Sequence, residues 1–371
     1  MKKLIISMSL LFAVMNSYAQ QYEFQNIIDI DANPVISQGN TGTCWSFSTS
    51  SFLESEIIRI KGKHIDLSEM YTVRNTYPKK IENYILRQGK AQFGEGGLAH
   101  DVINSVRDYG IVPIEAYSGL MGEETYNHSE MFKTLQSVID AYAKSNGPIS
   151  MHWKSITENI LDTYMGKQVK EFTYEGKKYT PESFLKMTGI NPDNYVTVTS
   201  FANQKNYTPF ILNIPDNFSN GSMYNLPLDE YIKNIDNALD KGFTLSLDCD
   251  VSEATFSSKH GVAFVATSKE DEKKGLTEII TEKAVDAELR LKDFYSFDTQ
   301  DDHLMHIVGK VKDQKGNIYY KVKNSWGGNS ERIGNDGYIY MSVPYMKLKS
   351  ISVLVHKDAL VKSTKDQLGI K

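Results

Sequence analysis

The residues best suited to covalent chemistry lie in a short segment near the beginning of the chain. Cys44, one of only two cysteines, follows two glycines and two threonines in the stretch from Gln38 to Phe47. Apolar residues at near-helical spacing follow it and Gly62 offers a stop, so we expect a helix that begins at Cys44. The unpaired N–H groups and the dipole of a first helical turn favour a thiolate. Cys44 is therefore a candidate nucleophile, and the alternative is a buried thiol at a helix start.

A cysteine nucleophile needs an imidazole that takes and returns its proton. His260 and His306 are both candidates because each precedes an apolar strand. Residues 304–324 are typical of two strands around a turn centred near Lys315, and His306 and Asn324 are equally distant from that centre. These two side chains would then face each other and form a hydrogen bond. A different turn would slip this register by one or two residues.

Two further features surround this hairpin. Trp326, just after Asn324, would cover the contact between histidine and asparagine and exclude water, although a large aromatic residue at a strand end is often simply part of the core. His303 and His306 suggest a metal site, but residues three apart on a strand point to opposite faces. We therefore expect no metal and no organic cofactor.

Several motifs together resemble the papain-like cysteine peptidases, in content and in order. They are Gln38, Gly42-Thr-Cys-Trp-Ser-Phe47, Leu67-Ser-Glu69, Gly96-Gly97, His306 and Asn324-Ser-Trp-Gly327. The resemblance extends from about residue 35 to 345. It implies that Cys44 is the nucleophile, His306 the general acid and base, and Asn324 the residue that orients the imidazole. It also implies an oxyanion hole made by Gln38 and the backbone N–H of Cys44, with Trp45, Gly96 and Gly97 in supporting positions.

Two departures from the common papain pattern are similar to the bleomycin hydrolase and aminopeptidase C branch. Thr41 and Glu95 stand where that pattern has disulfide-forming cysteines, and the separation between cysteine and histidine is long. The same branch is indicated by Glu95-Gly-Gly-Leu-Ala-His-Asp101, Tyr109-Gly-Ile-Val-Pro113 and Leu247-Asp-Cys-Asp-Val251. The branch implies peptide or protein substrates, a homo-oligomer, and a C-terminus that caps the cleft and favours substrates with free N-termini. No motif in the tail, 362–371, indicates such a cap.

The second cysteine, Cys249, leaves two interpretations open. An exported chain with two cysteines can form one disulfide, or both thiols can be free. A catalytic Cys44 must stay reduced, so Cys249 would be a buried thiol in the strand 243–249.

The pattern along the chain predicts an α+β fold of the papain-like two-lobe type, with its cleft between the lobes. We expect a helical lobe at 20–114, an insertion at 115–235 with helices around 130–144 and 154–165, and a β-rich lobe at 236–355. A C-terminal tail follows at 356–371. The strands of the β-rich lobe are expected at 243–247, 261–265, 304–311, 318–323 and 337–342.

Residues 1–19 are typical of a secretory signal peptide. Two lysines precede an apolar run, and small residues stand at 17 and 19, which predicts cleavage near Gln20 and export to the periplasm or the exterior. The run is too short for a membrane span, so no membrane association is expected after cleavage. The formal net charge of −5 comes from interspersed charges, and this does not suggest nucleic acid binding.

The sequence therefore predicts a cysteine peptidase that uses a Cys44, His306 and Asn324 triad, as an aminopeptidase on peptides with free N-termini. An endopeptidase with an open cleft would use the same residues. A third hypothesis is a degenerate papain fold that acts as a binding module. The presence of all four expected polar residues, Gln38, Cys44, His306 and Asn324, argues against it. A small-molecule amide hydrolase or acyltransferase would share the triad.

Overall fold

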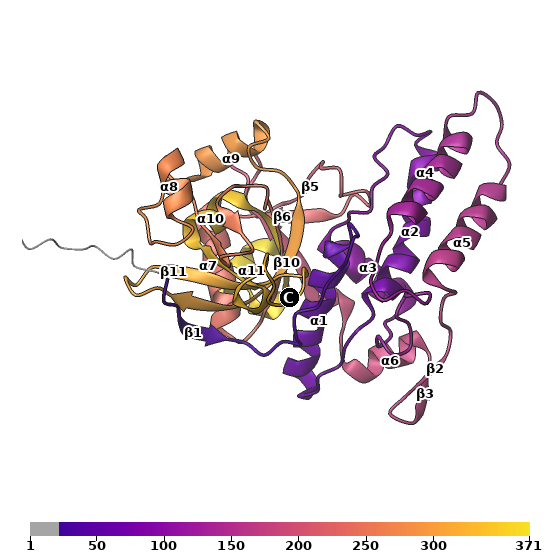
Figure 1. Ribbon diagram of the computed structural model, residues 1–371, viewed down its shortest axis with the longest axis horizontal. Coiled ribbons are helices and arrows are strands. Elements are labelled where there is room, and N and C mark those ends of the chain that lie inside the picture. Colours follow the sequence, from indigo (N-terminus) through magenta and orange to yellow (C-terminus); the bar gives the residue numbers. More distant parts are fainter. Residues whose placement is uncertain (1–21) are drawn as a thin grey trace, which may run out of the picture.

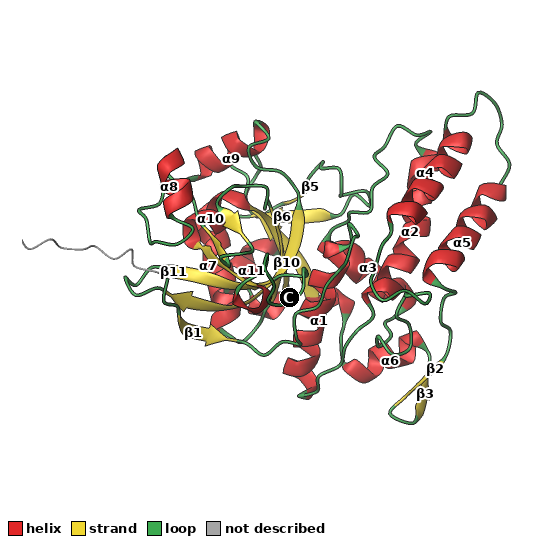
Figure 2. Ribbon diagram, viewed as in Figure 1, coloured by secondary structure: helices red, strands yellow, loops and turns green. Residues whose placement is uncertain are grey.

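The computed structural model describes residues 22–371, and they form two lobes that meet along one helix, α1 (Figure 1). The signal peptide expected at 1–19 lies outside the described residues. Within 22–371 no helix is both long and apolar enough to cross a membrane. One lobe is mainly helical, and the other holds most strands together with the helices from α7 (Leu228–Asp240) to α11 (Lys362–Leu368) (Figure 2), which is the predicted α+β class.

The helical lobe is built from elements of the first half of the chain. They are α1 (Cys44–Lys61), α2 (Glu69–Leu86), α3 (Ala99–Tyr109), α4 (Ser129–Ala143), α5 (His152–Met165), β2 (Phe172–Tyr174), β3 (Lys177–Tyr179) and α6 (Pro181–Thr188). The predicted helix at Cys44 is confirmed, and Gly62 ends it in the left-handed conformation with φ 64°. Glycine adopts that conformation without steric cost.

The β-rich lobe holds one long sheet with helices packed against it. Its strands are β1 (Gln25–Asp29), β4 (Tyr195–Thr199), β5 (Pro209–Ile211), β6 (Ser222–Asn225), β7 (Leu245–Cys249), β8 (Phe256–Ser257), β9 (Val262–Ala263), β10 (His303–Lys312), β11 (Ile318–Lys323), β12 (Tyr338–Ser342) and β13 (Ser350–His356). Its helices are α7 (Leu228–Asp240), α8 (Lys269–Lys274), α9 (Ala287–Tyr295), α10 (Val343–Lys349) and α11 (Lys362–Leu368). The strand order is β5-β6-β4-β13-β7-β10-β11-β12-β9-β8, and β1 also pairs with β10. All five strands predicted after Gly242 are present, with ends shifted by at most two residues.

The central strand β10 connects the two lobes because its two faces have different neighbours. Leu304 belongs to the apolar cluster of the helical lobe, and Ser48 of α1 donates a hydrogen bond to the backbone oxygen of Met305 at 2.6 Å. The side chains of Met305 and Ile307 pack instead with α7 inside the β-rich lobe. A residue's position along β10 therefore decides which lobe its side chain faces.

The hairpin of β10 and β11 has the predicted turn but a different register. The Asp313 side chain accepts hydrogen bonds from the backbone N–H groups of Lys315 and Asn317, so the turn is where the sequence predicts it. A bulge between Ile307 and Gly309 inserts one extra residue into β10. His306 is consequently opposite Lys323 rather than Asn324, and the predicted cross-strand pair is wrong.

Residues 115–235 do not form a unit of their own. The predicted helices in this region are confirmed as α4 and α5, which pack in the helical lobe, whereas β4 to β6 extend the main sheet beyond β13. The helix α7 then packs inside the β-rich lobe. Residues 115–235 therefore contribute to both lobes.

The C-terminal tail is held against α7. Thr364 of α11 donates to Glu230 and its hydroxyl accepts from Asn234, at 2.5 and 3.0 Å, and Leu368 and Ile370 pack on the apolar core of the β-rich lobe. Because α7 and α1 contact opposite faces of β10, the tail lies on the side of the sheet away from Cys44.

Candidate active site

Cys44 is the first residue of α1 and its side chain is buried. The first N–H groups of a helix have no partner inside the helix, so the thiol lies beside unpaired donors. Burial nevertheless raises the pKa of Cys44 to about 12, and the backbone N–H of Leu304 acts in the opposite direction. In this arrangement burial favours the neutral thiol, which contacts the backbone N–H of Leu304 near the beginning of β10.

His303, at the start of β10, is the histidine that contacts the asparagine. Its Nε2 lies 2.8 Å from Oδ1 of Asn324, and the same oxygen accepts the backbone N–H of Ser325 at 2.7 Å. A carboxamide oxygen only accepts, so Nε2 must carry the hydrogen. Nδ1 of the neutral ring is then the basic nitrogen.

The environment of His303 keeps the imidazole neutral and shielded. Burial lowers the pKa of His303 to about 4, while the hydrogen bond to Asn324 raises it. The indole ring of Trp326 lies with its centroid 4.8 Å from that of the imidazole. Trp326 therefore covers a contact between histidine and asparagine, as predicted, but the histidine is His303.

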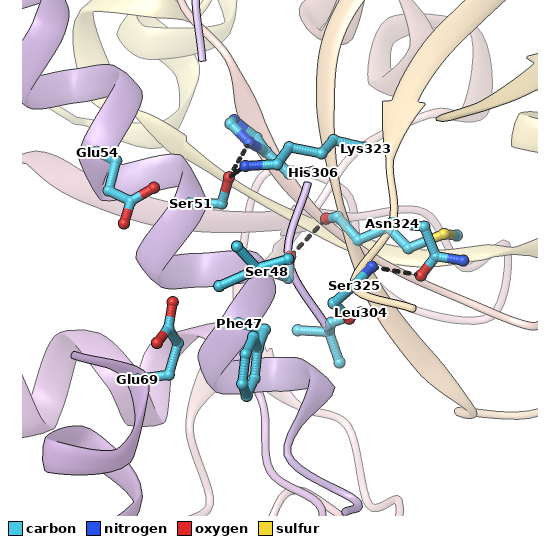
Figure 3. A pocket seen from close by; sticks show the side chains of 12 residues that line it. Phe47, Ser48, Ser51, Glu54, Glu69, Leu304, His306, Lys323, Asn324 and Ser325 are labelled. Carbon is cyan, nitrogen blue, oxygen red and sulfur yellow. Dashed lines mark hydrogen bonds between the residues drawn. The ribbon is translucent and has the colours of Figure 1, made fainter. Parts of the chain in front are cut away.

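His306 points into the interior on the other side of the strand. Figure 3 shows it beside α1, where Ser51 Oγ lies 3.0 Å from its Nδ1 and Lys323 donates to the same hydroxyl at 2.8 Å. Burial and the charge of Lys323 lower the pKa of His306 well below its ordinary value. The predicted hydrogen bond between His306 and Asn324 is thus wrong, since the bulge in β10 gives His306 a different partner.

One sequence signal pointed to His303. Asn324 follows the last residue of β11. In an antiparallel hairpin the end of the second strand lies beside the beginning of the first, so the partner of Asn324 must lie near the first residue of β10. His303 begins that strand. The sequence pattern suggests His303 only as a metal ligand, because the bulge in β10 leaves no mark in that pattern.

Gln38 and its neighbours join the loop before Cys44 to the segment after β11. The backbone N–H of Gln38 donates to the Ser325 oxygen, and the Ser325 hydroxyl donates to Oε1 of Gln38 at 2.6 Å. Nε2 of Gln38 donates to the Thr41 oxygen at 2.7 Å. Because an amide nitrogen carries two N–H groups, one N–H remains for another acceptor.

Hydrogen bonds hold this loop without a disulfide. Glu95 accepts the backbone N–H of Gly42 at 2.9 Å, and its own carbonyl accepts the indole N–H of Trp45 at 3.0 Å. A Cβ at Gly97 would lie 3.1 Å from the Trp45 ring, so glycine allows this close packing. Both Cys44 and Cys249 are free thiols, which leaves Cys44 able to react.

A second polar cluster includes Glu54 and Glu69, which line the cavity of Figure 3. Glu54, Asp66 and Glu69 can each place an oxygen within 4.8 Å of the other two, as a metal site would require. Burial raises the pKa of Glu54 to about 8, and the charge of Lys323 opposes this shift. The lysine is thus a cation already positioned beside these acids.

The comparisons with known proteins show the family of the chain. A model of the Peptidase C1-like family matches residues 6–370. The chain is 25% identical to aminopeptidase G of Lactobacillus delbrueckii subsp. lactis over 394 residues, which covers 92% of this chain and 85% of the relative. It is 24% identical to aminopeptidase C of Lactococcus lactis subsp. cremoris, with 90% and 83% covered.

The fold has a counterpart among solved structures. A crystal structure of PepW from Lactobacillus rhamnosis aligns with a TM-score of 0.69 at 19% identity, covering 93% of this chain and 84% of that one. A family model that spans nearly the whole sequence, curated relatives that match over most of their length, and a shared two-lobe fold lead to one assignment. The chain belongs to the Peptidase C1-like family and is a papain-like cysteine peptidase of the aminopeptidase C branch.

Proposed function

We propose that this peptidase is an aminopeptidase in which Cys44 is the nucleophile, His303 the general acid and base, and Asn324 the residue that orients the imidazole. The observation that carries the proposal is the 2.8 Å contact between His303 and Asn324, made one residue before the Leu304 backbone N–H that contacts the Cys44 thiol. Relatives named aminopeptidase C and aminopeptidase G support the exopeptidase assignment.

The reaction follows from which nitrogen is free. As the Cys44 sulfur attacks the carbonyl carbon of the first peptide bond, Nδ1 of His303 takes the thiol proton. The resulting imidazolium protonates the leaving amine, and the C–N bond breaks to leave a thioester on Cys44. Water then attacks the thioester while Nδ1 takes its proton, and return of that proton to sulfur releases the amino acid.

The pKa shifts of Cys44 and His303 bear on the step at which the thiol proton moves. Burial keeps the Cys44 thiol protonated, with its pKa at about 12, and keeps His303 neutral, with its pKa at about 4. A stable pair of Cys44 thiolate and His303 imidazolium is therefore disfavoured before substrate binds. Proton transfer to His303 therefore accompanies the attack on the carbonyl.

Gln38 is proposed as a donor to the developing oxyanion, together with the backbone N–H of Cys44. The remaining N–H of the Gln38 amide supplies one hydrogen bond, and the first turn of α1 supplies the other. Hydrogen bonds to Thr41 and Ser325 fix the amide before substrate arrives. Removal of one such donor typically lowers kcat by about 10²–10³-fold.

The test compares one peptide series with free and with acetylated N-termini. The purified chain without residues 1–19 is assayed under reducing conditions, with Cys44→Ala as the control. We expect cleavage of the free series and none by Cys44→Ala. Equal activity of Cys44→Ala, or no cleavage of either series, would overturn the assignment to this triad and leave the binding module as the better description.

An endopeptidase is the second candidate, and the position of the tail favours it. Residues of α11 are bound to α7 through Thr364, so the tail does not cap the cleft as the branch implies. Cleavage of acetylated peptides at internal bonds would establish this alternative.

We also propose that the enzyme is exported after cleavage near Gln20, which the apolar run in residues 4–15 supports. N-terminal sequencing of the protein from its native host tests this. We expect a mature chain that begins at Gln20 or Gln21, and an intact Met1 on active enzyme would contradict it.

A further inference from the structure

Two aspartates face the first turn of α1. Asp248 on β7 is the cross-strand partner of Leu304, whose backbone N–H contacts the Cys44 thiol. Two residues earlier on the same face, the hydroxyl of Ser246 lies 3.0 Å from that of Ser48 on α1. Side chains two apart share a face of a strand, so Asp248 points at the turn that begins with Cys44. Asp301 precedes His303 by two residues and has its carboxyl group beside that of Asp248.

These carboxyl groups accept no hydrogen bond from an N–H or hydroxyl group. Asp248 is only 2% exposed, and the oxygens of Asp248 and Asp301 have no such donor in the described part of the chain. The two carboxyl groups are hydrogen-bonded only to each other, when one of them is protonated. Buried polar groups in folded proteins are almost always paired. Burial and the neighbouring acid raise the pKa of Asp248 well above its ordinary value and that of Asp301 to about 7. No cation among the described residues forms an ion pair with these two acids.

A third aspartate, Asp216, closes this region by reaching Gly96 of the helical lobe. Asp216 lies in the loop 212–221 between β5 and β6, and a Cβ built on Gly96 would come within 2.5 Å of its carboxyl atoms. The charge of Asp216 acts on both Asp248 and Asp301. Asn217 ties the loop together by donating to the backbone oxygens of Leu212 and Gly221. Asp216 therefore covers the double-glycine segment. We call Asp216, Asp248 and Asp301 the acidic pocket.

Two cations, Lys80 and Arg290, approach the acidic pocket but form no ion pair with it. Lys80 donates to the backbone oxygen of Gly96 and its charge acts on Asp216. No ion pair within 4.0 Å joins any of the three aspartates to a Lys, Arg or His among residues 22–371. Lys80 interacts with Asp216 and Asp301, and the buried Arg290 interacts with Asp248. Neither cation forms an ion pair with the three acids, so the acidic pocket favours a further cation, and Asp216 and Asp301 are partly exposed.

We propose that the acidic pocket binds the α-ammonium group of the substrate, and that the loop 212–221 blocks any residue beyond it. The inference rests on the proposed peptidase function of Cys44. In a peptide the α-nitrogen is two bonds from the carbonyl carbon that the sulfur attacks, so a cation site beside Cys44 suits that nitrogen. Asp216 over Gly96 then limits the substrate to one residue on this side of the scissile bond. The loop and the two strand aspartates replace the chain's own C-terminus, which is held on α7.

The same chemistry would suit the side-chain ammonium of a lysine one residue further from the scissile bond. The two sources differ in what an N-terminal acetyl group does. Acetylation removes the α-ammonium charge but leaves a lysine side chain charged, so paired ligands separate them without any mutation.

The first experiment uses the unmutated enzyme and three reversible nitrile inhibitors that form an adduct with the catalytic thiol. They are leucine nitrile, N-acetyl-leucine nitrile and N-acetyl-lysyl-leucine nitrile. We expect leucine nitrile to bind at least about 100-fold more tightly than its acetylated form. Equal affinity would overturn the proposal, and tightest binding of the acetyl-lysyl compound would assign the pocket to a side chain instead.

The second experiment replaces the aspartates with the isosteric amide. Asp248→Asn and Asp301→Asn are compared with Asp302→Asn, an exposed neighbour outside the acidic pocket. We expect each pocket variant to raise KM for leucine amide substrates by about 10-fold or more, with kcat changed much less. Asp302→Asn should stay within about twofold of the unmutated enzyme, and thermal unfolding checks that all three variants are folded.

The outcomes separate this inference from the proposed function. If the unmutated enzyme cleaves no peptide, or cleaves without Cys44, the proposed function fails. If cleavage depends on Cys44 while Asp248→Asn and Asp301→Asn preserve the preference for free over acetylated N-termini, only the acidic pocket is wrong.

Discussion

The two histidines of β10 lie three residues apart and have opposite surroundings. His303 contacts Asn324 and the ring of Trp326 at the start of the strand, whereas His306 contacts Ser51 inside the protein. Both rings are buried and burial lowers both pKa values. The difference lies in the partners: His303 has a neutral acceptor that fixes its tautomer, and His306 has a nearby lysine.

This comparison shows that a buried histidine is identified by its partners rather than by its burial or its pKa direction. The cavity in Figure 3 separates the two environments, with His306 and Lys323 on one side and Asn324 on the other. One histidine is placed to move a proton, and the other is part of a polar network that joins α1 to β10 and β11.

The largest expected effect on kcat comes from replacing the catalytic histidine, and a separate replacement of the other histidine is its control. His303→Ala should lower kcat by about 10²–10⁴-fold, because it removes the group that transfers the proton. His306→Gln should keep kcat within about threefold and lower the melting temperature, because it disturbs a buried contact with Ser51. Steady-state kinetics and thermal unfolding of both variants measure this. The reverse pattern would return the catalytic role to His306.

A smaller loss of activity is expected from Asn324→Ala. This change leaves both reacting groups in place but removes the acceptor that orients His303, and a misplaced catalytic group can cost about 10²-fold. We expect the loss in kcat, with KM nearly unchanged. A variant as active as the unmutated enzyme would show that Trp326 alone is sufficient to position the ring.

Ser51→Ala tests the other histidine's network and should act on stability. The hydroxyl contacts both His306 and Lys323, and leaving buried polar groups unpaired costs about 1–3 kcal/mol. We expect chemical denaturation to show a loss of that size while kcat per folded molecule stays the same. A tenfold fall in kcat would mean that the interior network and the active site are coupled.

The smallest expected effect is on the pH dependence of stability. The folded pKa values of His303 and His306 lie below the ordinary histidine value, so below about pH 6.5 the unfolded chain binds protons that the folded protein does not. Stability is therefore lost as pH falls from about 6.5 towards the folded pKa values. His306→Gln removes one of these two contributions, so its melting temperature should fall less between pH 7 and pH 5 than that of the unmutated enzyme.

The same variant separates activity from stability in this pH range. The acid limb of kcat/KM should follow the pKa of His303, at about 4, and His306→Gln should leave that limb in place. A limb that moves in His306→Gln would assign it to the interior histidine.

Local patterns were sufficient for the elements and for several site residues. Cys44 at the start of a helix, Gly62 at its end, and the turn at Asp313 were all predictable because each depends on residues adjacent in sequence. The helices α4 and α5 were predictable for the same reason. Gln38 and Asn324 were identified through their motifs, and the structure joins them through Ser325.

The partners of these elements depended on packing between distant segments. The choice between His303 and His306 rests on one inserted residue in β10, and a bulge of that size leaves no trace in the alternation of apolar residues. The division of residues 115–235 between two lobes, and the binding of the tail to α7, likewise rest on long-range contacts.

The residue types and their order indicate the chemistry: a thiol at a helix start and an asparagine shortly before a tryptophan. That the two cysteines stay free is seen only in the structure. Only the tertiary structure decided which imidazole reaches that asparagine, and that Asp216, Asp248 and Asp301 come together beside Cys44. The physical reason is that residue type and helical or strand period are local properties. Strand register, the face to which a side chain points, and the contact of a loop with a distant glycine are properties of the whole packed chain.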